Sequence, residues 1–167
     1  MTKENKMSEI RIEKVVLSVG GIGDELEKGI KLISFLAGKK AVKTTSKKRI
    51  PNFNIRPGLE IGGKVTLRKD FDELLKRLLL AIGNKVKEKQ ISENSFSFGI
   101  EEYIQIPDIE YQRDIGMRGF EVSVSFSRKG KRTKLKKIKK GKYPQKQKVK
   151  REEIINFIKN KFKVEVE

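Results

Sequence analysis

The sequence predicts a mixed domain of strands and helices, because two kinds of hydrophobic pattern alternate along it. Apolar residues recur at every second position, as in half-buried strands, over 10–19, 61–68 and 120–126. They recur three and four residues apart, as in amphipathic helices, over 24–37, 71–82 and 152–162. At 167 residues the chain is long enough for one domain with a real core. We expect a frayed N-terminus at 1–8 and a single domain over 9–167.

The first strand and helix meet at a glycine-rich turn, Gly20-Gly21-Ile22-Gly23. Asp24 is predicted to cap the helix, with Glu27 completing a capping box, and Gly38 is predicted to end it. Such a turn can hold a phosphate at a helix N-terminus, but here the glycine spacing is not G-x-G-x-x-G and no P-loop lysine follows. Acidic residues also stand where a phosphate would sit, so we predict an ordinary tight turn.

Residues 47–60 form a basic loop, which we call the finger, and it leads into the 61–68 strand. Its prolines and charges cannot pack a core, and cations surround Phe53. In the strand, Val65 and Leu67 alternate with Lys64, Thr66 and Arg68. A positive finger at a sheet edge suits a polyanionic partner. Two roles of Phe53 stay open: stacking on an unpaired base, or packing back against the sheet.

The second helix, about 71–82, shows the widest apolar stripe, with Asp70 as its predicted cap and Glu73 at the third position. A polar linker is predicted over 84–94, and 96–100 alternates as a strand, with 103–106 extended up to Pro107. In the 120–126 strand, apolar residues alternate with glutamate and serines. That polar face of small residues would let a flat ligand lie close to the sheet.

Composition points to nucleic acid, and second to an anionic membrane surface. The chain has 40 Lys plus Arg against 22 Asp plus Glu, a net charge of +18. It has no cysteine and no histidine, which excludes thiolate and imidazole metal sites and histidine acid–base catalysis. Acidic pairs such as Glu101-Glu102, or Asp108 with Glu110, are interpreted as solvated carboxylates. We therefore predict no enzyme, no catalytic residue, no metal site and no cofactor.

Neither a membrane span nor a signal peptide is predicted. No apolar run approaches the roughly 20 residues that a spanning helix needs. The first ten residues, MTKENKMSEI, lack the apolar core of a signal peptide. We expect a soluble, intracellular protein.

Residues 128–151 form what we call the arm. They contain fourteen basic residues and no acidic one, so basic and acidic residues are nearly equal in number in the rest of the chain. With few large apolar residues, the arm cannot offset its own ordering entropy, and we expect it to be mobile in isolation. A final helix, 152–162, and a possible short strand at Val164 and Val166 follow it. The arm is thus an insertion within one fold, placed to bind phosphates.

Four blocks of sequence occur in an order that resembles one known family. They are RIEKVV (11–16) with VGGIGD (19–24), PNFNIRPG (51–58) followed by IGGKVTLR (61–68), FSFGIEEY (96–103), and IPDIEY (106–111) followed by GMRG (116–119). Together they resemble the L-five family of large-subunit ribosomal proteins, which binds 5S ribosomal RNA. The short N-terminus and the basic insertion are similar to its archaeal branch. The resemblance implies an α+β fold, with an antiparallel sheet and helices packed on one face, in the central protuberance of the cytoplasmic large subunit.

The resemblance and the charges together give the expected contacts with ribosomal RNA. These residues are Arg11, Lys14, Ser18, Lys39, Lys43, Thr66, Arg68, Arg128, Lys131, Arg132, Lys136, Lys137 and Lys140. Ser18 and Lys39 stand where the family usually has asparagine and glutamine. The helix at 152–162 begins after Lys150-Arg151, without the hydroxyl cap that is usual in the family.

The finger is implied to approach the transfer RNA in the peptidyl site and the head of the small subunit. Its residues for this role are Lys48, Arg49, Phe53, Asn54, Arg56, Pro57 and Gly58. Further implied partners are large-subunit ribosomal RNA, other proteins of the central protuberance and a protein of the small-subunit head.

Two other functions are compatible with the charge. A free-standing RNA chaperone or regulator could use the same basic surfaces outside the ribosome. Attachment to a membrane surface through the arm is disfavoured, because the arm lacks an amphipathic apolar face.

Overall fold

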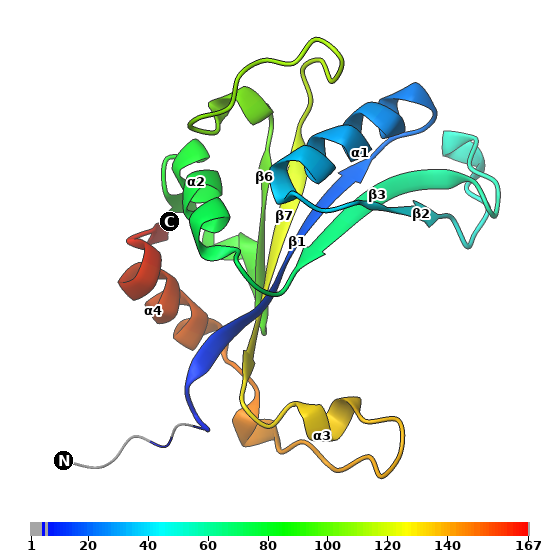
Figure 1. Ribbon diagram of the computed structural model, residues 1–167. Coiled ribbons are helices and arrows are strands. Elements are labelled where there is room, and N and C mark those ends of the chain that lie inside the picture. Colours follow the sequence, from blue (N-terminus) through cyan, green and yellow to red (C-terminus); the bar gives the residue numbers. More distant parts are fainter. Residues whose placement is uncertain (1–4, 6, 167) are drawn as a thin grey trace.

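The fold is α+β, as predicted, and is built around one antiparallel sheet. The computed structural model describes residue 5 and residues 7–166, and its main sheet has the strand order β2-β3-β1-β7-β6-β5 (Figure 1). The strands are β1 (Ile10–Gly20), β2 (Val42–Thr45), β3 (Glu60–Leu67), β5 (Ile91–Ser92), β6 (Ser95–Ile100) and β7 (Phe120–Arg128). Two further strands, β4 (Lys85–Val86) and β8 (Glu165–Val166), form a separate parallel pair.

Three helices cover one face of this sheet: α1 (Asp24–Ala37), α2 (Asp72–Ala81) and α4 (Arg151–Phe162). Leu32, Leu75 and Ile158, one from each helix, are fully buried in the same cluster as the inward residues of β1 and β7. Phe126 of β7 stacks on Phe96 with ring centroids 5.8 Å apart, and meets Phe157 of α4 edge-on at 5.6 Å. The core therefore lies between the sheet and the three helices.

No long helix of the described residues packs on the opposite face of the sheet, which we call the open face. Residues opposed in an antiparallel ladder share a face. Ser18 of β1 opposes Lys64 of β3 on one side and Glu121 of β7 on the other, while Ser123 of β7 opposes Ser97 of β6. The predicted alternation of the 120–126 strand is thus confirmed. Side chains on this face include Arg11, Lys14, Val16, Ser18, Val42, Thr44, Lys64, Thr66, Ser95, Ser97, Glu121, Ser123, Ser125 and Ser127.

Both predicted N-terminal helix caps are wrong. Asp24 is the first residue of α1, preceded by Gly23 at φ 62°, and no side chain caps that end. Asp70 has φ 56°, outside the helical region, and α2 begins after Phe71, again without a side-chain cap. Asp24 lies in the first turn of α1, and Asp72 and Glu73 lie in the first turn of α2, where carboxylates interact favourably with the helix dipole. The predicted end of α1 is confirmed by Gly38, which is left-handed at φ 60°.

The predicted linker at 84–94 is also wrong, because it contains β4 and β5. Val86 and Ile91 are only 1% and 3% exposed. Each is a lone apolar residue in a polar stretch, so neither produces a periodic pattern. Residues Tyr103–Gln105 form a 3-10 turn instead of an extended segment, and the Tyr103 hydroxyl accepts a hydrogen bond of 2.8 Å from the Gln112 backbone N–H.

At the C-terminal end of the described residues, Val164 is buried in the core and β8 pairs with β4. The predicted frayed segment 1–8 falls mostly outside the described residues, although Ser8 N–H donates to the Asn5 carbonyl at 2.8 Å. The predicted strand near the C-terminus is confirmed as β8. Within the described part of the chain, no helix has the length and apolar character needed to cross a bilayer.

Candidate nucleic-acid interface

The open face carries short, hydroxyl-bearing side chains and is flanked by cations. Ser123 and Ser125 of β7 lie opposite Ser97 and Ser95 of β6, so four short hydroxyl side chains form its centre. Lys14 of β1 lies beside this group, opposite Ser125. Short side chains let a ribose or base edge approach the strands, and each hydroxyl can both donate and accept a hydrogen bond. Such a surface suits the sugar edge of RNA more than it suits an apolar protein.

One end of the open face is hollowed. A cavity of about 580 Å³ lies there, with Ser18, Gly20, Gly99 and Glu121 among its lining residues. A Cβ on Gly20 or Gly99 would meet nothing within 4 Å, so the space is open above both backbones. The carboxylate of Glu121 disfavours a phosphate at this end. The hollow is therefore suited to a neutral polar group, such as a ribose.

The structure brings together most of the residues predicted on the sheet, but not all. Lys14, Ser18 and Thr66 share the open face, and Arg11 opposes Ser127 at its lower end. Lys64, opposite Ser18, adds a cation near the hollowed end of this face. Its place on the polar side of the 61–68 strand was predictable from the alternation, and it joins the candidate RNA-contacting residues. Arg68 follows directly after β3 and is exposed.

Lys39 and Lys43 lie apart from this group. Lys39 is exposed beyond the C-terminal end of α1. Lys43 opposes Gly63, which borders Ile30 of α1, and is therefore on the helix side of the sheet. Its ammonium donates to the Glu60 carboxylate at 2.7 Å. This hydrogen bond and the charge of Glu60 raise the pKa of Lys43 above its ordinary 10.5, with a smaller contribution from Glu27.

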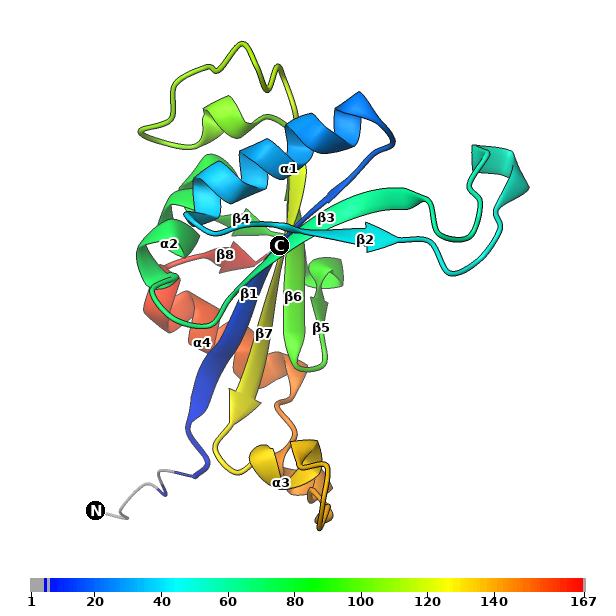
Figure 2. The same cartoon turned by 45° about the vertical axis from the view of Figure 1, so that its right-hand side comes forward.

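The finger projects from the sheet edge between β2 and β3 (Figure 2). Backbone hydrogen bonds close its base, with Gly58 N–H donating to the Ser46 carbonyl at 2.9 Å, and a bridge between Ile50 and Ile55 closes its tip. Phe53 is 68% exposed, so the alternative in which it packs back against the sheet is wrong. A cavity of about 230 Å³ beside it is lined by Arg49, Pro51, Asn54, Ile55 and Arg56.

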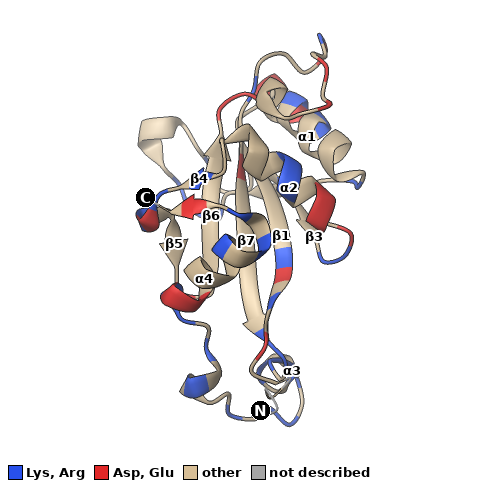
Figure 3. Cartoon of the chain, turned by 90° about the vertical axis from the view of Figure 1, so that its left-hand side faces the viewer, with Lys and Arg blue, Asp and Glu red and all other residues tan. Residues whose placement is uncertain are grey.

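The arm leaves the other end of the sheet and carries cations without acidic residues (Figure 3). It contains a one-turn helix, α3 (Arg132–Leu135), and a 3-10 turn, Gln145–Gln147. Four of its fourteen cations pair with carboxylates of the body, namely Arg128, Lys129, Lys131 and Arg151. Among the described residues the other ten have no carboxylate within ion-pair distance, so they are available to phosphates. The expected mobility of the arm stays a prediction.

The loop at 101–119 differs in charge from the rest of the molecule. It holds five acidic residues and only two basic ones, Arg113 and Arg118. Tyr111 and Met117, in the same loop, are more than half exposed. From the sequence its carboxylates were interpreted as solvated, and the exposed apolar side chains could not be predicted because they produce no periodic pattern. Acidic residues repel phosphate, so this loop suits a basic protein partner.

Among the described residues, no three His, Cys, Asp or Glu side chains gather as metal ligands do. The absence of a metal site and of a cofactor stays a prediction.

Comparison with known proteins matches nearly the whole chain. Residues 5–56 match the family model for ribosomal protein L5, and residues 60–159 match the separate model for the C-terminus of the same family. The large ribosomal subunit protein uL5 of Nanoarchaeum equitans is 40% identical over 98% of this chain and 99% of its own length. Its counterpart in Sulfolobus acidocaldarius is 38% identical over 98% and 94%. That of Methanosphaera stadtmanae is 39% identical over 90% and 91%.

Proposed function

Because the chain belongs to the ribosomal protein L5 family, and is therefore a structural constituent of the large ribosomal subunit rather than an enzyme, we propose that its open face binds 5S ribosomal RNA. The resemblance to the archaeal branch agrees with the archaeal relatives. One observation carries the proposal: the face left uncovered by helices is the one that combines serine hydroxyls with Lys14, Lys64 and Thr66.

The proposed binding combines two kinds of contact. Arg11, Lys14, Lys64 and Arg68 neutralise phosphates around the open face, which supplies affinity that depends on salt. Ser18, Thr66 and the central serines bond ribose 2′-hydroxyls, which distinguish RNA from DNA and are displayed in the shallow minor groove of A-form RNA. The sheet thus recognises the shape of a duplex more than its sequence.

The arm supplies a second anchor on 5S or large-subunit ribosomal RNA. Its unpaired cations include Arg132, Lys136, Lys137 and Lys140 from the predicted set. Arg128 and Lys131 are paired with carboxylates and serve the RNA less directly. Lys39 and Lys43 lie off the open face, so RNA contacts made by them fall outside that face.

The finger is proposed to approach the transfer RNA in the peptidyl site. Phe53, exposed at its tip beside Arg49, Asn54 and Arg56, can stack on an unpaired base while the cations neutralise its phosphates. Lys48, Pro57 and Gly58 complete the proposed tip. The ordered base of the finger keeps this group at a fixed distance from the sheet.

Protein partners are proposed for the acidic loop at 101–119. A basic protein of the small-subunit head fits its charge better than it fits the positive finger, which would repel it. Exposed Tyr111 and Met117 offer apolar anchors for such a contact. Other proteins of the central protuberance are the second class of expected partner.

A filter-binding titration of 5S RNA against salt tests the proposal. We expect a steep loss of affinity with salt and a clear preference for 5S RNA over an unrelated RNA of equal length. A flat salt dependence, or equal affinity for both RNAs, would refute it. Sedimentation in high salt separates the alternative of a free-standing RNA chaperone, because a chaperone washes off large subunits whereas an assembled component stays bound.

A further inference from the structure

The root of the arm, residues 128–131, is tied to the body by carboxylates from three places. Lys129 Nζ lies 3.6 Å from Glu9, just before β1. Lys131 forms an ion pair with Glu13 within β1. Arg128 Nη2 donates to Glu153 of α4 at 2.6 Å. The RNA-binding surfaces proposed above do not use these carboxylates.

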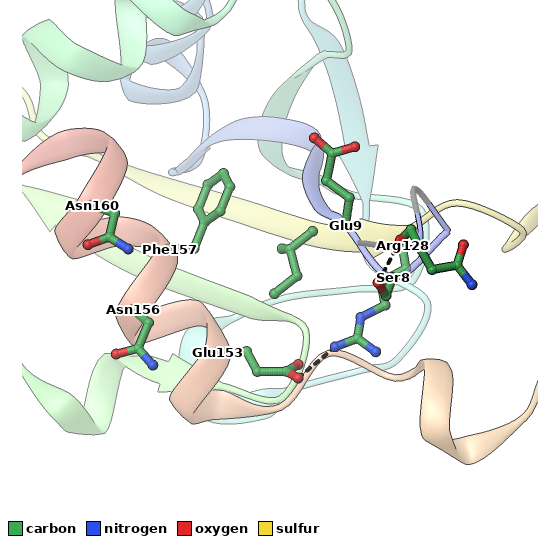
Figure 4. A pocket seen from close by; sticks show the side chains of 9 residues that line it. Ser8, Glu9, Arg128, Glu153, Asn156, Phe157 and Asn160 are labelled. Carbon is green, nitrogen blue, oxygen red and sulfur yellow. Dashed lines mark hydrogen bonds and ion pairs between the residues drawn. The ribbon is translucent and has the colours of Figure 1, made fainter. Parts of the chain in front are cut away.

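Arg128 joins both ends of the arm to the helix layer. Its second amino group donates to the Lys146 carbonyl at 3.1 Å, near the end of the arm. Figure 4 shows it reaching toward Glu153 beside a cavity of about 630 Å³ that Asn156, Phe157 and other residues line. The Arg128 side chain is only 13% exposed, so water screens this pair weakly. Glu153 also accepts from the Lys150 backbone N–H at 3.0 Å, which fixes it at the start of α4.

Glu13 is turned toward the arm by an irregularity in the sheet. Ile12 opposes Phe126 and Lys14 opposes Ser125, so Glu13 is the extra residue of a β-bulge. A bulge redirects its extra side chain away from the regular alternation. Glu13 thereby reaches Lys131, 118 positions further along the chain.

Binding of a polyanion does not by itself explain why these three carboxylates lie beside the arm. A chain of net charge +18 that binds a polyanion gains nothing in charge from three acidic residues beside its most basic segment. Exposed ion pairs are individually weak. Here, however, three of them act on one short segment that has too few apolar side chains to be held in place by packing. Their common effect is to fix the direction in which the ten unpaired cations leave the body.

We propose that Glu9, Glu13 and Glu153 are positioning residues that determine specificity. They hold the root so that the arm keeps a fixed orientation relative to the open face, and one RNA molecule can contact both surfaces. The inference rests on the proposed binding of 5S RNA. An RNA with the right shape engages both surfaces together, whereas an unrelated RNA engages only one at a time. Without the carboxylates, the arm binds any RNA that its charge attracts.

Glutamine substitution separates positioning from charge. The root variant is Glu9→Gln, Glu13→Gln, Glu153→Gln. The matched control changes three exposed carboxylates that have no ion-pair partner among the described residues, Glu73→Gln, Glu93→Gln, Glu110→Gln. Both variants have a net charge of +21 instead of +18. Far-ultraviolet circular dichroism and thermal unfolding establish that each is folded.

The readout is the ratio of the dissociation constants for an unrelated RNA and for 5S RNA. Both variants are expected to bind the unrelated RNA more tightly, but only the root variant loses about tenfold in the ratio. The swapped pair Glu13→Lys with Lys131→Glu is expected to keep the wild-type ratio, while Glu13→Lys alone lowers it. An unchanged ratio in the root variant, or an equal fall in both variants, overturns the inference. A ratio of one in the wild-type protein refutes the proposed function instead.

Discussion

Removing unpaired arm cations is expected to weaken 5S RNA binding by an amount set by phosphate contacts. The change is Lys136→Gln, Lys137→Gln, Lys140→Gln, and none of the three has an ion-pair partner among the described residues. Each phosphate contact contributes about 0.7–0.9 to the slope of log affinity against log salt, so the slope falls by about 2–3. If the variant and the wild-type protein bind 5S RNA equally at about 1 M salt, the variant binds about 30- to 80-fold more weakly at about 0.2 M. This difference in affinity corresponds to about 2–2.6 kcal/mol of binding free energy.

The assay is filter binding of 5S RNA at a series of salt concentrations. A control variant is needed that lowers the net charge by the same amount outside the arm. The control variant, Lys28→Gln, Lys31→Gln, Lys159→Gln, removes the same charge from exposed positions on helices α1 and α4. These positions lie on the helix side, away from the proposed interface, so the slope is expected to change by well under one. Equal slopes for the two variants would show that the arm acts only through net charge and would refute its role as an anchor.

Three further predictions concern the finger, the core and an edge ion pair. Phe53→Ala with Arg56→Ala should spare 5S binding but weaken transfer RNA binding to assembled ribosomes; loss of 5S binding would show that the surfaces are wrongly assigned. Phe126→Ala should lower the free energy of unfolding in urea by about 3–5 kcal/mol, because the ring is buried between two others, and a loss below about 1 kcal/mol would contradict this packing. The ammonium of Lys43 should titrate above pH 10.5 by NMR, and Glu60→Gln should lower its midpoint; since the folded pKa is raised, the stabilisation is present below pH 10.5 and disappears as pH rises through the folded value.

The sequence predicted the elements that carry a long periodic signal. The alternation from Phe120 to Phe126 identified both the core face and the polar face of β7, because one side of the strand is buried and the other is not. The stripe of leucines in α2 identified its buried face for the same reason. It could not identify β4 and β5, since two-residue strands with one buried side chain, such as Val86, have no period to detect.

The helix caps and the arm show two other limits. An acidic residue before an apolar stripe is compatible with the cap position and with the first helical turn, and Asp24 occupies the latter. The fourteen cations of the arm were countable, but which of them are paired was not. Pairs such as Lys131 with Glu13 depend on the fold bringing distant residues together and on a bulge that sequence does not reveal.

The candidate interface was predictable in composition and only partly in geometry. Strand alternation placed Thr66 on a polar face, and the family resemblance made Ser18 an expected RNA contact. The strand register puts both on the open face. Lys43 could not be placed, because its face depends on how β2 pairs with β3. The exposure of Phe53 depends on the bridge that closes the finger, which no residue pattern indicates.

Site-directed cross-linking tests most directly whether the open face binds 5S RNA. The chain contains no cysteine, so Ser97→Cys on the open face and Glu73→Cys on α2 each give a single site for a benzophenone label. Each labelled protein is irradiated with 5S RNA, and the adducts are separated on a denaturing gel. If the open face binds 5S RNA, we expect an adduct with 5S RNA from position 97 and little or none from position 73. Equal adducts from both positions, or an adduct from position 73 alone, would contradict it.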